Sequence, residues 1–292
     1  MMEEEKLMRG DQTSFYSLMR KRCINQKDFS DITFVVGSLK QTIAAHRCIL
    51  AARSEVFRSM FVQQSIHATG DQEVPYVLAD VRPEVFLTTL DYMYTNCCTL
   101  TPNLAPDVLA MSIDYGLDGL RRLSVRYMLD SMVVDSVCSV LQSAVIHGQE
   151  EILQRALSFI EANTREVLTT TQFLELSEQS LSVILRSENI EADEIDILHA
   201  VRRWSSANHV VSGKPMSQLA APIIGLVRLP LLSAEELSKV EDDNREEKVI
   251  PVQQLAAAWR FHALKENAPP SVMVRPRKGT KERDTHQYLV NN

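Results

Sequence analysis

Residues 28–61 read DFSDITFVVGSLKQTIAAHRCILAARSEVFRSMF. Within this stretch, a β-branched and aromatic run at residues 31–36 ends at Gly37, and a second short run follows at residues 41–44. Two such runs joined by a glycine-containing turn predict a β-hairpin. A small sheet is therefore expected near the start of the chain.

The hairpin is followed by two predicted helices. Small residues predict the first helix at residues 46–52. Ser54 is suited to cap the second helix, in which Phe57, Met60 and Phe61 share one face.

One further helix and one further strand flank this stretch. Phe15, Leu18 and Met19 form a short apolar stripe on a helix predicted ahead of the hairpin. Residues 74–78 predict a third strand, in which Pro75 marks an edge position because proline cannot donate a ladder hydrogen bond.

The apolar periodicity between residues 104 and 264 is helical, in short amphipathic segments joined by polar loops. This layout is typical of an array of helical pairs rather than of one long coiled coil. The acidic stretch 235–248 is expected to be a helix end and an exposed connection. Residues 1–12, and the basic, proline-containing tail 266–292, have little apolar content and are expected to be disordered.

Composition narrows the class of protein. A chain of 292 residues, 45% hydrophobic and 24% charged, favours two globular domains. The net charge of -7 argues against general nucleic-acid binding, which requires concentrated Lys and Arg. The five cysteines form no CxxC pair, the N-terminus lacks a signal-peptide pattern, and charges interrupt every apolar run. We therefore expect an intracellular protein, cytoplasmic or nuclear or both, with no membrane span.

The quoted stretch resembles the signature of the BTB/POZ family: an Asp before the first strand, a hairpin, a His followed by a basic residue, a Leu-Ala-Ala helix and a Ser-x-x-Phe helix. DVRPEVFLTTLDYMYT at residues 80–95 and YGLDGLRRLSVRYM at residues 115–128 are similar to later blocks of that family. The resemblance implies an α+β domain over residues 13–130, a small mixed sheet flanked by helices.

Residues 134–163, 172–190 and 193–208, followed by VRLPLL at 227–232, resemble the all-α BACK domain of kelch-like proteins, built of short helical pairs. The resemblance places this domain at residues 131–265. In kelch-like proteins a kelch propeller follows, whereas this sequence continues only into its tail, so a member of the family without the propeller is expected.

Three candidate sites follow from the resemblance. By resemblance, Phe15, Leu18 and Met19 pack across a two-fold axis in a homodimer; the alternative is packing within their own domain. Asp31 and Arg47 match a charged pocket near the dimer groove; the alternative, which their charges favour, is a buried ion pair or simple capping of strand and helix.

The third candidate is the loop after Phe61, where BTB proteins that recruit cullin-3 carry a hydrophobic-x-Glu motif. Phe61, Ile66, His67 and Ala68 are the candidate contact residues. Ile66 is the candidate apolar anchor, but Ala68 stands where Glu is expected. This departure puts cullin-3 recruitment in doubt.

No catalytic, cofactor-binding or metal motif is recognisable: GxSxG, GxGxxG, HExxH and a phosphate loop are all missing from the sequence. The adjacent Cys97 and Cys98 are expected to be small buried hydrophobes, and the basic residues of the tail a solvated charge run. The expected function is therefore a non-enzymatic, homodimerising adaptor or scaffold. It would act within a cullin-3 ubiquitin ligase on unknown clients or, alternatively, as a transcriptional co-regulator that holds peptides in the dimer groove.

Overall fold

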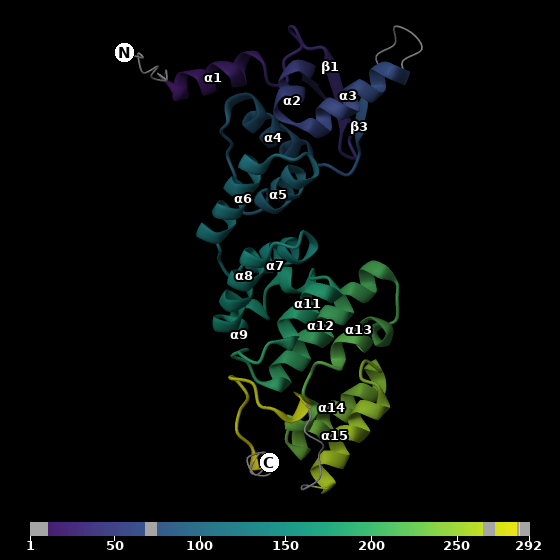
Figure 1. Ribbon diagram of the computed structural model, residues 1–292. Helices are drawn as coiled ribbons and strands as arrows, with labels where there is room; N and C mark the ends of the chain where they lie inside the picture. Colours follow the sequence, from purple (N-terminus) through teal and green to yellow (C-terminus); the bar gives the residue numbers. More distant parts are fainter. Residues whose placement is uncertain (1–10, 68–74, 265–271, 285, 287–292) are drawn as a thin grey trace, which may run out of the picture. The chain divides into compact units, whose positions relative to one another are not determined.

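The computed structural model describes residues 11–67, 75–264, 272–284 and 286. The chain divides into two compact units, residues 1–131 and residues 132–292 (Figure 1). Most of the N-terminal segment expected to be disordered, residues 1–10, lies outside the described part. The first helix begins at Gln12, where the Asp11 side chain accepts hydrogen bonds from the amides of Thr13 and Ser14.

Within its described residues, 11–67 and 75–131, the first unit combines six helices with three strands. They are α1 (Gln12–Arg22), β1 (Ile32–Val36), β2 (Gln41–Ala45), α2 (Arg47–Arg53), α3 (Glu55–His67), β3 (Tyr76–Leu78), α4 (Pro83–Thr95), α5 (Ala105–Asp114) and α6 (Asp118–Asp130). The sheet order is β2-β1-β3, with β2 antiparallel and β3 parallel to β1. The predicted hairpin is therefore confirmed, and the strand after Pro75 lies at an edge.

Gly37 sets the hairpin turn. Its φ of +74° lies in the left-handed region, and a Cβ atom there would stand 3.1 Å from the ring of Pro83 at the start of α4. The Gly37 amide also donates to the carbonyl of Leu78 at 2.9 Å, which ties the turn to β3. A glycine is thus required both by the backbone and by its neighbour.

The core of the first unit is centred on Phe34 in the middle of β1. Its ring lies 4.8 Å from the ring of Phe86, 5.7 Å from that of Tyr76 and 5.9 Å from that of Phe57, measured between centroids. Phe34, Phe57 and Phe86 are fully buried. One strand residue therefore joins α3, α4 and β3.

The second unit is helical throughout its described residues. Its elements are α7 (Val137–Ile146), α8 (Glu150–Ala162), α9 (Thr164–Val167), α10 (Thr171–Leu174), α11 (Glu178–Arg186), α12 (Glu194–Ser212), α13 (Met216–Ile224), η1 (Leu229–Leu231), α14 (Ala234–Glu247), α15 (Val252–Leu264) and η2 (Val272–Val274). Sequential neighbours pack as pairs, α7 with α8, α12 with α13 and α14 with α15. The predicted array of helical pairs is confirmed.

The acidic stretch 235–248 is not an exposed connection, as the sequence suggested. It forms α14, which begins with a capping box in which Ser233 and Glu236 exchange hydrogen bonds. Leu237 and Val240 bury one stripe of the helix, and the Arg202 guanidinium of α12 bonds to the carbonyl of Val240. A short apolar stripe and a cap suffice to order this charged segment.

The expectation of a disordered tail is wrong for residues 272–284 and 286. These residues lie against the second unit, where the side chains of Arg277 and Arg283 and the ring of His286 are largely buried. The basic tail is thus part of the folded unit over this range, and its contacts are described below.

We predict that Phe34→Ala will destabilise the first unit by about 3–5 kcal/mol, because it removes a buried ring from the centre of the core. Circular dichroism during urea unfolding should show this loss. Both tryptophans, Trp204 and Trp259, belong to the second unit, so the tryptophan fluorescence transition should stay in place. Val77→Ala, at an exposed position of β3, is the matched control. Equal losses in the two variants would contradict the central role of Phe34.

Candidate interaction sites

Helix α1 presents an apolar surface to solvent. The side chains of Phe15 and Leu18 are 45% and 47% exposed, and none of the residues of α1 is buried. Met19, one helical turn after Phe15, is partly buried and packs against the core of the first unit. Of the three residues predicted at a dimer interface, Phe15 and Leu18 are thus available to a partner, whereas Met19 is turned towards its own unit.

Helix α1 packs on α4. A guanidinium nitrogen of Arg20 lies 3.6 Å from a carboxylate oxygen of the buried Asp91. Burial raises the pKa of Asp91, and the charge of Arg20 opposes this rise. The contact with α4 thus includes an ion pair and the partly buried Met19, while Phe15 and Leu18 remain about half exposed.

Asp31 and Arg47 meet as the sequence predicted, but in a capping arrangement. The Asp31 carboxylate accepts the backbone N–H of Arg47 at 2.7 Å, which satisfies an amide at the start of α2. The Arg47 side chain donates to the backbone carbonyl of Asp31 at 3.1 Å, and its guanidinium lies 5.2 Å from the centroid of the Phe61 ring. These contacts fasten β1 to α2 within the unit.

The candidate cullin-contact segment belongs to a helix over most of its length. Helix α3 continues to His67, so Ile66 and His67 are helical, whereas Ala68 lies outside the described residues. Phe61 is buried, with its ring 5.9 Å from Phe57 and 5.7 Å from Tyr76. Phe61 is therefore a core residue, and its assignment to a partner-contact surface was wrong.

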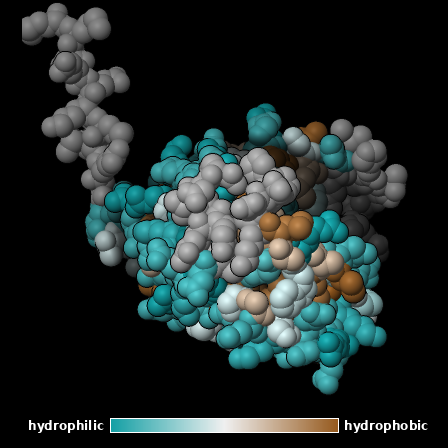
Figure 2. Space-filling model, turned by 90° about the horizontal axis from the view of Figure 1, so that it is seen from below, coloured by the Kyte–Doolittle hydropathy of each residue, from teal (hydrophilic) through white to brown (hydrophobic). Residues whose placement is uncertain are grey.

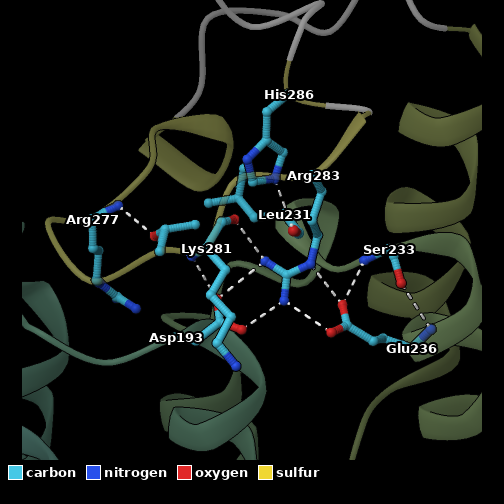
Figure 3. A network of polar contacts seen from close by, with 9 residues as sticks. Asp193, Leu231, Ser233, Glu236, Arg277, Lys281, Arg283 and His286 are labelled. Carbon is cyan, nitrogen blue, oxygen red and sulfur yellow. Dashed lines mark hydrogen bonds and ion pairs between the residues drawn. The ribbon is translucent and has the colours of Figure 1, made fainter.

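The tail enters the second unit through Arg283. Its guanidinium makes two hydrogen bonds to the Asp193 carboxylate, at 2.6 and 3.1 Å, and two to Glu236, at 2.7 and 3.0 Å (Figure 3). Asp193 caps α12 and Glu236 belongs to the capping box of α14. A single arginine from the tail thus joins the first turns of two helices.

Arg277 is the second anchor, and it is almost completely enclosed. The side chains of Arg277 and Glu194 are 1% and 0% exposed, with 2.6 Å between the guanidinium and the carboxylate. Three further donors of Arg277 bond to backbone carbonyls, those of Leu185, Ser187 and Leu226. The other oxygen of Glu194 accepts the backbone N–H of Arg228 at 2.9 Å.

Backbone contacts hold the segment between the two arginines. The amides of Lys278 and Gly279 donate to the carbonyls of Glu188 and Ile190 at 3.0 and 2.9 Å. A Cβ atom on Gly279 would lie 2.2 Å from the backbone nitrogen of Ala192, so no other residue fits without rearrangement. His286 ends the described contacts by a 2.9 Å hydrogen bond to the carbonyl of Leu231. Residues 272–284 and 286 lie against the unit as one segment with two charged anchors; we call this segment the C-terminal clasp.

The electrostatics of the clasp follow from burial and pairing. Burial alone would raise the pKa of Asp193, but its hydrogen bonds from Arg283 and from the Lys281 amide outweigh burial and lower the pKa. The same balance, with Arg283 and Ser233 as donors, lowers the pKa of Glu236. The N-terminus of α12, where backbone N–H groups point outward, further suits negative charge.

A second surface lies between α14 and α15. A groove of about 880 Å³ is lined mainly by apolar side chains, among them Ile250, Leu255 and Trp259, with charged residues at its rim. Figure 2 shows this end of the molecule, on which hydrophobic patches interrupt a largely hydrophilic surface.

Other chemistry has little support in the described part of the chain. Its His, Cys, Asp and Glu residues include no group of three or more that is placed to hold a metal ion, and none of its helices is both long and apolar enough to cross a membrane. All five cysteines are free. Cys97 is exposed and Cys98 half-buried, so the expectation that both are buried hydrophobes was wrong.

Comparison with known proteins identifies both units. The BTB/POZ domain family matches residues 21–132, and the BACK family, BTB And C-terminal Kelch, matches residues 137–241. The chain belongs to the BTB/POZ–BACK family. The expected order, an α+β BTB/POZ domain followed by an all-helical BACK domain, is confirmed. Both domain families are protein-interaction modules rather than enzymes.

Individual relatives share this arrangement to different extents. The chain is similar to BTB/POZ domain-containing protein 19 of Bos taurus, with 36% identity over 97% of this chain and 96% of the relative. The protein of the same name from Homo sapiens is 36% identical over 94% of each chain. BTB/POZ domain-containing protein 9 of Drosophila melanogaster is 32% identical over 77% of this chain, but over only 30% of that relative.

We predict that Arg283→Gln will destabilise the BACK unit by about 3 kcal/mol at neutral pH, because it leaves two carboxylates without their charged partner. Asp193 and Glu236 have lowered pKa values in the folded chain, so their pairing contributes fully above about pH 4.3 and is lost as the pH falls through the folded pKa values. The stability difference from the wild type should therefore shrink as the pH is lowered from 7 to 3.

Urea unfolding followed by tryptophan fluorescence measures this difference, since both tryptophans report on the second unit. Arg275→Gln is the matched control, because Arg275 lies in the same segment but its side chain is 67% exposed. The substitution removes only an ion pair with Glu188, in which the nitrogen and oxygen atoms are 3.8 Å apart. Its effect should stay within about 0.5 kcal/mol. Similar losses in both variants, or a loss that grows in acid, would rule out the assigned role of Arg283.

Proposed function

We propose that this chain is a non-catalytic adaptor or scaffold that pairs with a second copy of itself through the BTB/POZ unit. The observation that carries the proposal is the apolar surface of α1, on which Phe15 and Leu18 are each nearly half exposed. Adjacent exposed apolar side chains on one short helix favour a protein interface. An isologous interface requires such a self-complementary patch.

Pairing explains how a protein without a catalytic centre can act. Two copies present every BACK surface twice, and the second contact to a bivalent partner then forms at an effective concentration in the millimolar range. Weak contacts to clients are strengthened without any new contact. The five free cysteines support a reducing, intracellular location for this assembly.

Cullin-3 recruitment is the finer form of the proposal. Its candidate contact residues Ile66 and His67 come after the buried Phe61, at the end of α3. Ala68, where the recruiting motif of the family has Glu, weakens it. The client proteins of such a complex are not identified by any residue pattern in this chain.

The alternative is a transcriptional co-regulator that holds peptides through Asp31 and Arg47. Both residues contact their own unit, where they connect β1 to α2. No observation on these residues favours a peptide site, so the adaptor is the better supported function.

We predict that Phe15→Asp with Leu18→Asp will convert a dimer into a monomer. Two buried charges cannot be solvated or paired across a symmetric apolar interface, so the dissociation constant should rise by at least about 100-fold. Light scattering coupled to size exclusion should give twice the chain mass of 33.0 kDa for the wild type and the single mass for the variant.

Leu39→Asp is the matched control, since Leu39 is 92% exposed in the hairpin turn and should leave the dimer intact. A wild-type protein that stays monomeric at high concentration would refute pairing. So would a double variant that remains dimeric.

We predict that Ala68→Glu will strengthen binding to purified cullin-3 by about tenfold, equivalent to about 1.4 kcal/mol, because it restores the acidic position of the recruiting motif. Titration calorimetry of the wild type and the variant compares the two affinities. Ala68→Gln, similar in size but neutral, is the control. If the folded dimer binds no cullin-3 and the Glu variant gains nothing, the ubiquitin-ligase form of the proposal fails while the adaptor form stands.

A further inference from the structure

The carboxylates that receive the C-terminal clasp belong to the BACK domain itself. Asp193, Glu194 and Glu236 all lie within residues 137–241, the range matched by the BACK family. The two arginines that fill the site come from a segment beyond that range. Receptor and ligand are therefore separate parts of the chain, connected through residues 265–271.

The receptor has the geometry of an arginine site. Asp193 and Glu194 are fully buried, and carboxylates removed from water require a charged, hydrogen-bonding partner. The Asp193 contact is bidentate, and the three carbonyls around Arg277 match the several fixed donors of a guanidinium. A lysine ammonium, with a single nitrogen, cannot reach these acceptors together.

The clasp has the form of a short linear ligand. Two arginines six positions apart fill the two carboxylate sites, and between them Gly279 passes the backbone of residues 191 and 192 where no side chain fits. The backbone hydrogen bonds from the amides of Lys278 and Gly279 add affinity that does not depend on side-chain identity. The residues of the clasp whose identity the site requires are therefore the two arginines and the glycine, in the pattern Arg-x-Gly-x-x-x-Arg.

We propose that the site formed by Asp193, Glu194 and Glu236 is a recognition site for peptide segments of the form Arg-x-Gly-x-x-x-Arg, which the chain's own C-terminal clasp occupies in cis, with a turn at residues 277–280. A segment with the same chemistry binds there in trans when the clasp is displaced. The segment comes either from a client protein or from the tail of a second copy.

Because the chain's own clasp occupies the site, a partner's segment needs a higher affinity to bind there. A ligand attached through a short connection competes at an effective concentration in the millimolar range, so a free segment of equal intrinsic affinity displaces little of it. A partner must bind more tightly, or at two sites at once, as it does on a paired adaptor. The proposal extends beyond pairing through α1 and does not depend on it.

The test uses the full chain with a protease site placed within residues 265–271, cut after purification, so that the clasp becomes a non-covalent ligand of a unit that folded with it. A fluorescent peptide of residues 272–286 is then titrated, with anisotropy as the readout. The peptide should exchange into the cut chain and saturate. Peptides with Arg277→Ala and Arg283→Ala together should bind at least about 100-fold more weakly, and a peptide with Arg275→Ala within about threefold of the original.

A second preparation keeps the test decisive where exchange is slow: the uncut chain with Arg277→Ala and Arg283→Ala, whose own clasp cannot fill the site. The original peptide should bind it directly and raise its melting temperature. If neither preparation takes up the original peptide above the level of the double-alanine peptide, the proposal is overturned. Loss of the folded unit on cutting alone would overturn it too, because the clasp would then be a fixed part of the core.

A further arm separates the two sources of the segment. Light scattering of the full chain with Phe15→Asp and Leu18→Asp, which removes pairing through α1, is measured over a wide concentration range, with and without excess peptide. Growth beyond the mass of one chain that the peptide suppresses assigns the segment to the tail of a second copy. A constant mass, together with peptide uptake in the first two arms, assigns it to a separate protein.

Discussion

The second unit depends on a charge constraint at the start of α12. Asp193 and Glu194 are consecutive carboxylates with no exposed surface, and an unpaired buried charge costs several kcal/mol. The N-terminal end of the helix offsets part of that cost, and Arg283 and Arg277 offset most of the remainder. The same segment of the tail also contacts Glu236 in the capping box of α14 and the backbone of the loop before α12.

In the first unit the constraint concerns apolar side chains: those of Phe15 and Leu18 on α1 are not covered by the rest of the unit. A three-stranded sheet with five-residue and three-residue strands is short, and Phe34 uses its contacts to bind α3 and α4 to it. Helix α1 packs on α4, partly through Met19 and the Arg20–Asp91 ion pair. The exposed apolar residues of α1 are therefore a consequence of a core that is already filled by other helices.

The parts of this fold that could be predicted are those set by local sequence. Gly37 between two β-branched runs specifies the hairpin, and Pro75 specifies an edge strand, because each acts through its own backbone. The misassignment of Phe61 has a different origin: an apolar residue on a helix face looks the same whether it fills its own core or a partner's pocket. Only the positions of Phe57 and Tyr76 distinguish the two.

The C-terminal clasp could not be predicted because its partners are distant in the chain. Arg277 and Arg283 lie 83 and 90 residues from the carboxylates that bind them, and the segment around them is polar enough to suggest disorder. The one available signal was the adjacent pair Asp193 and Glu194 at the start of a predicted helix. This pair indicates a binding site for arginine only once both side chains are known to be buried.

The apolar contacts of α1 and the arginine–carboxylate contacts of the clasp differ in how readily they can exchange. Apolar side chains such as Phe15 and Leu18 cannot be covered by water at low cost, so an interface made from them stays closed once formed. Guanidinium–carboxylate contacts are different, because both groups are well hydrated when separated and the net free energy of pairing is a small difference between large terms. In the proposed adaptor, pairing through α1 would therefore persist while the contact made by the C-terminal clasp exchanges. The arginines lie on a tail outside the matched BACK range rather than on a helix within it, and this position would let a partner's segment replace them.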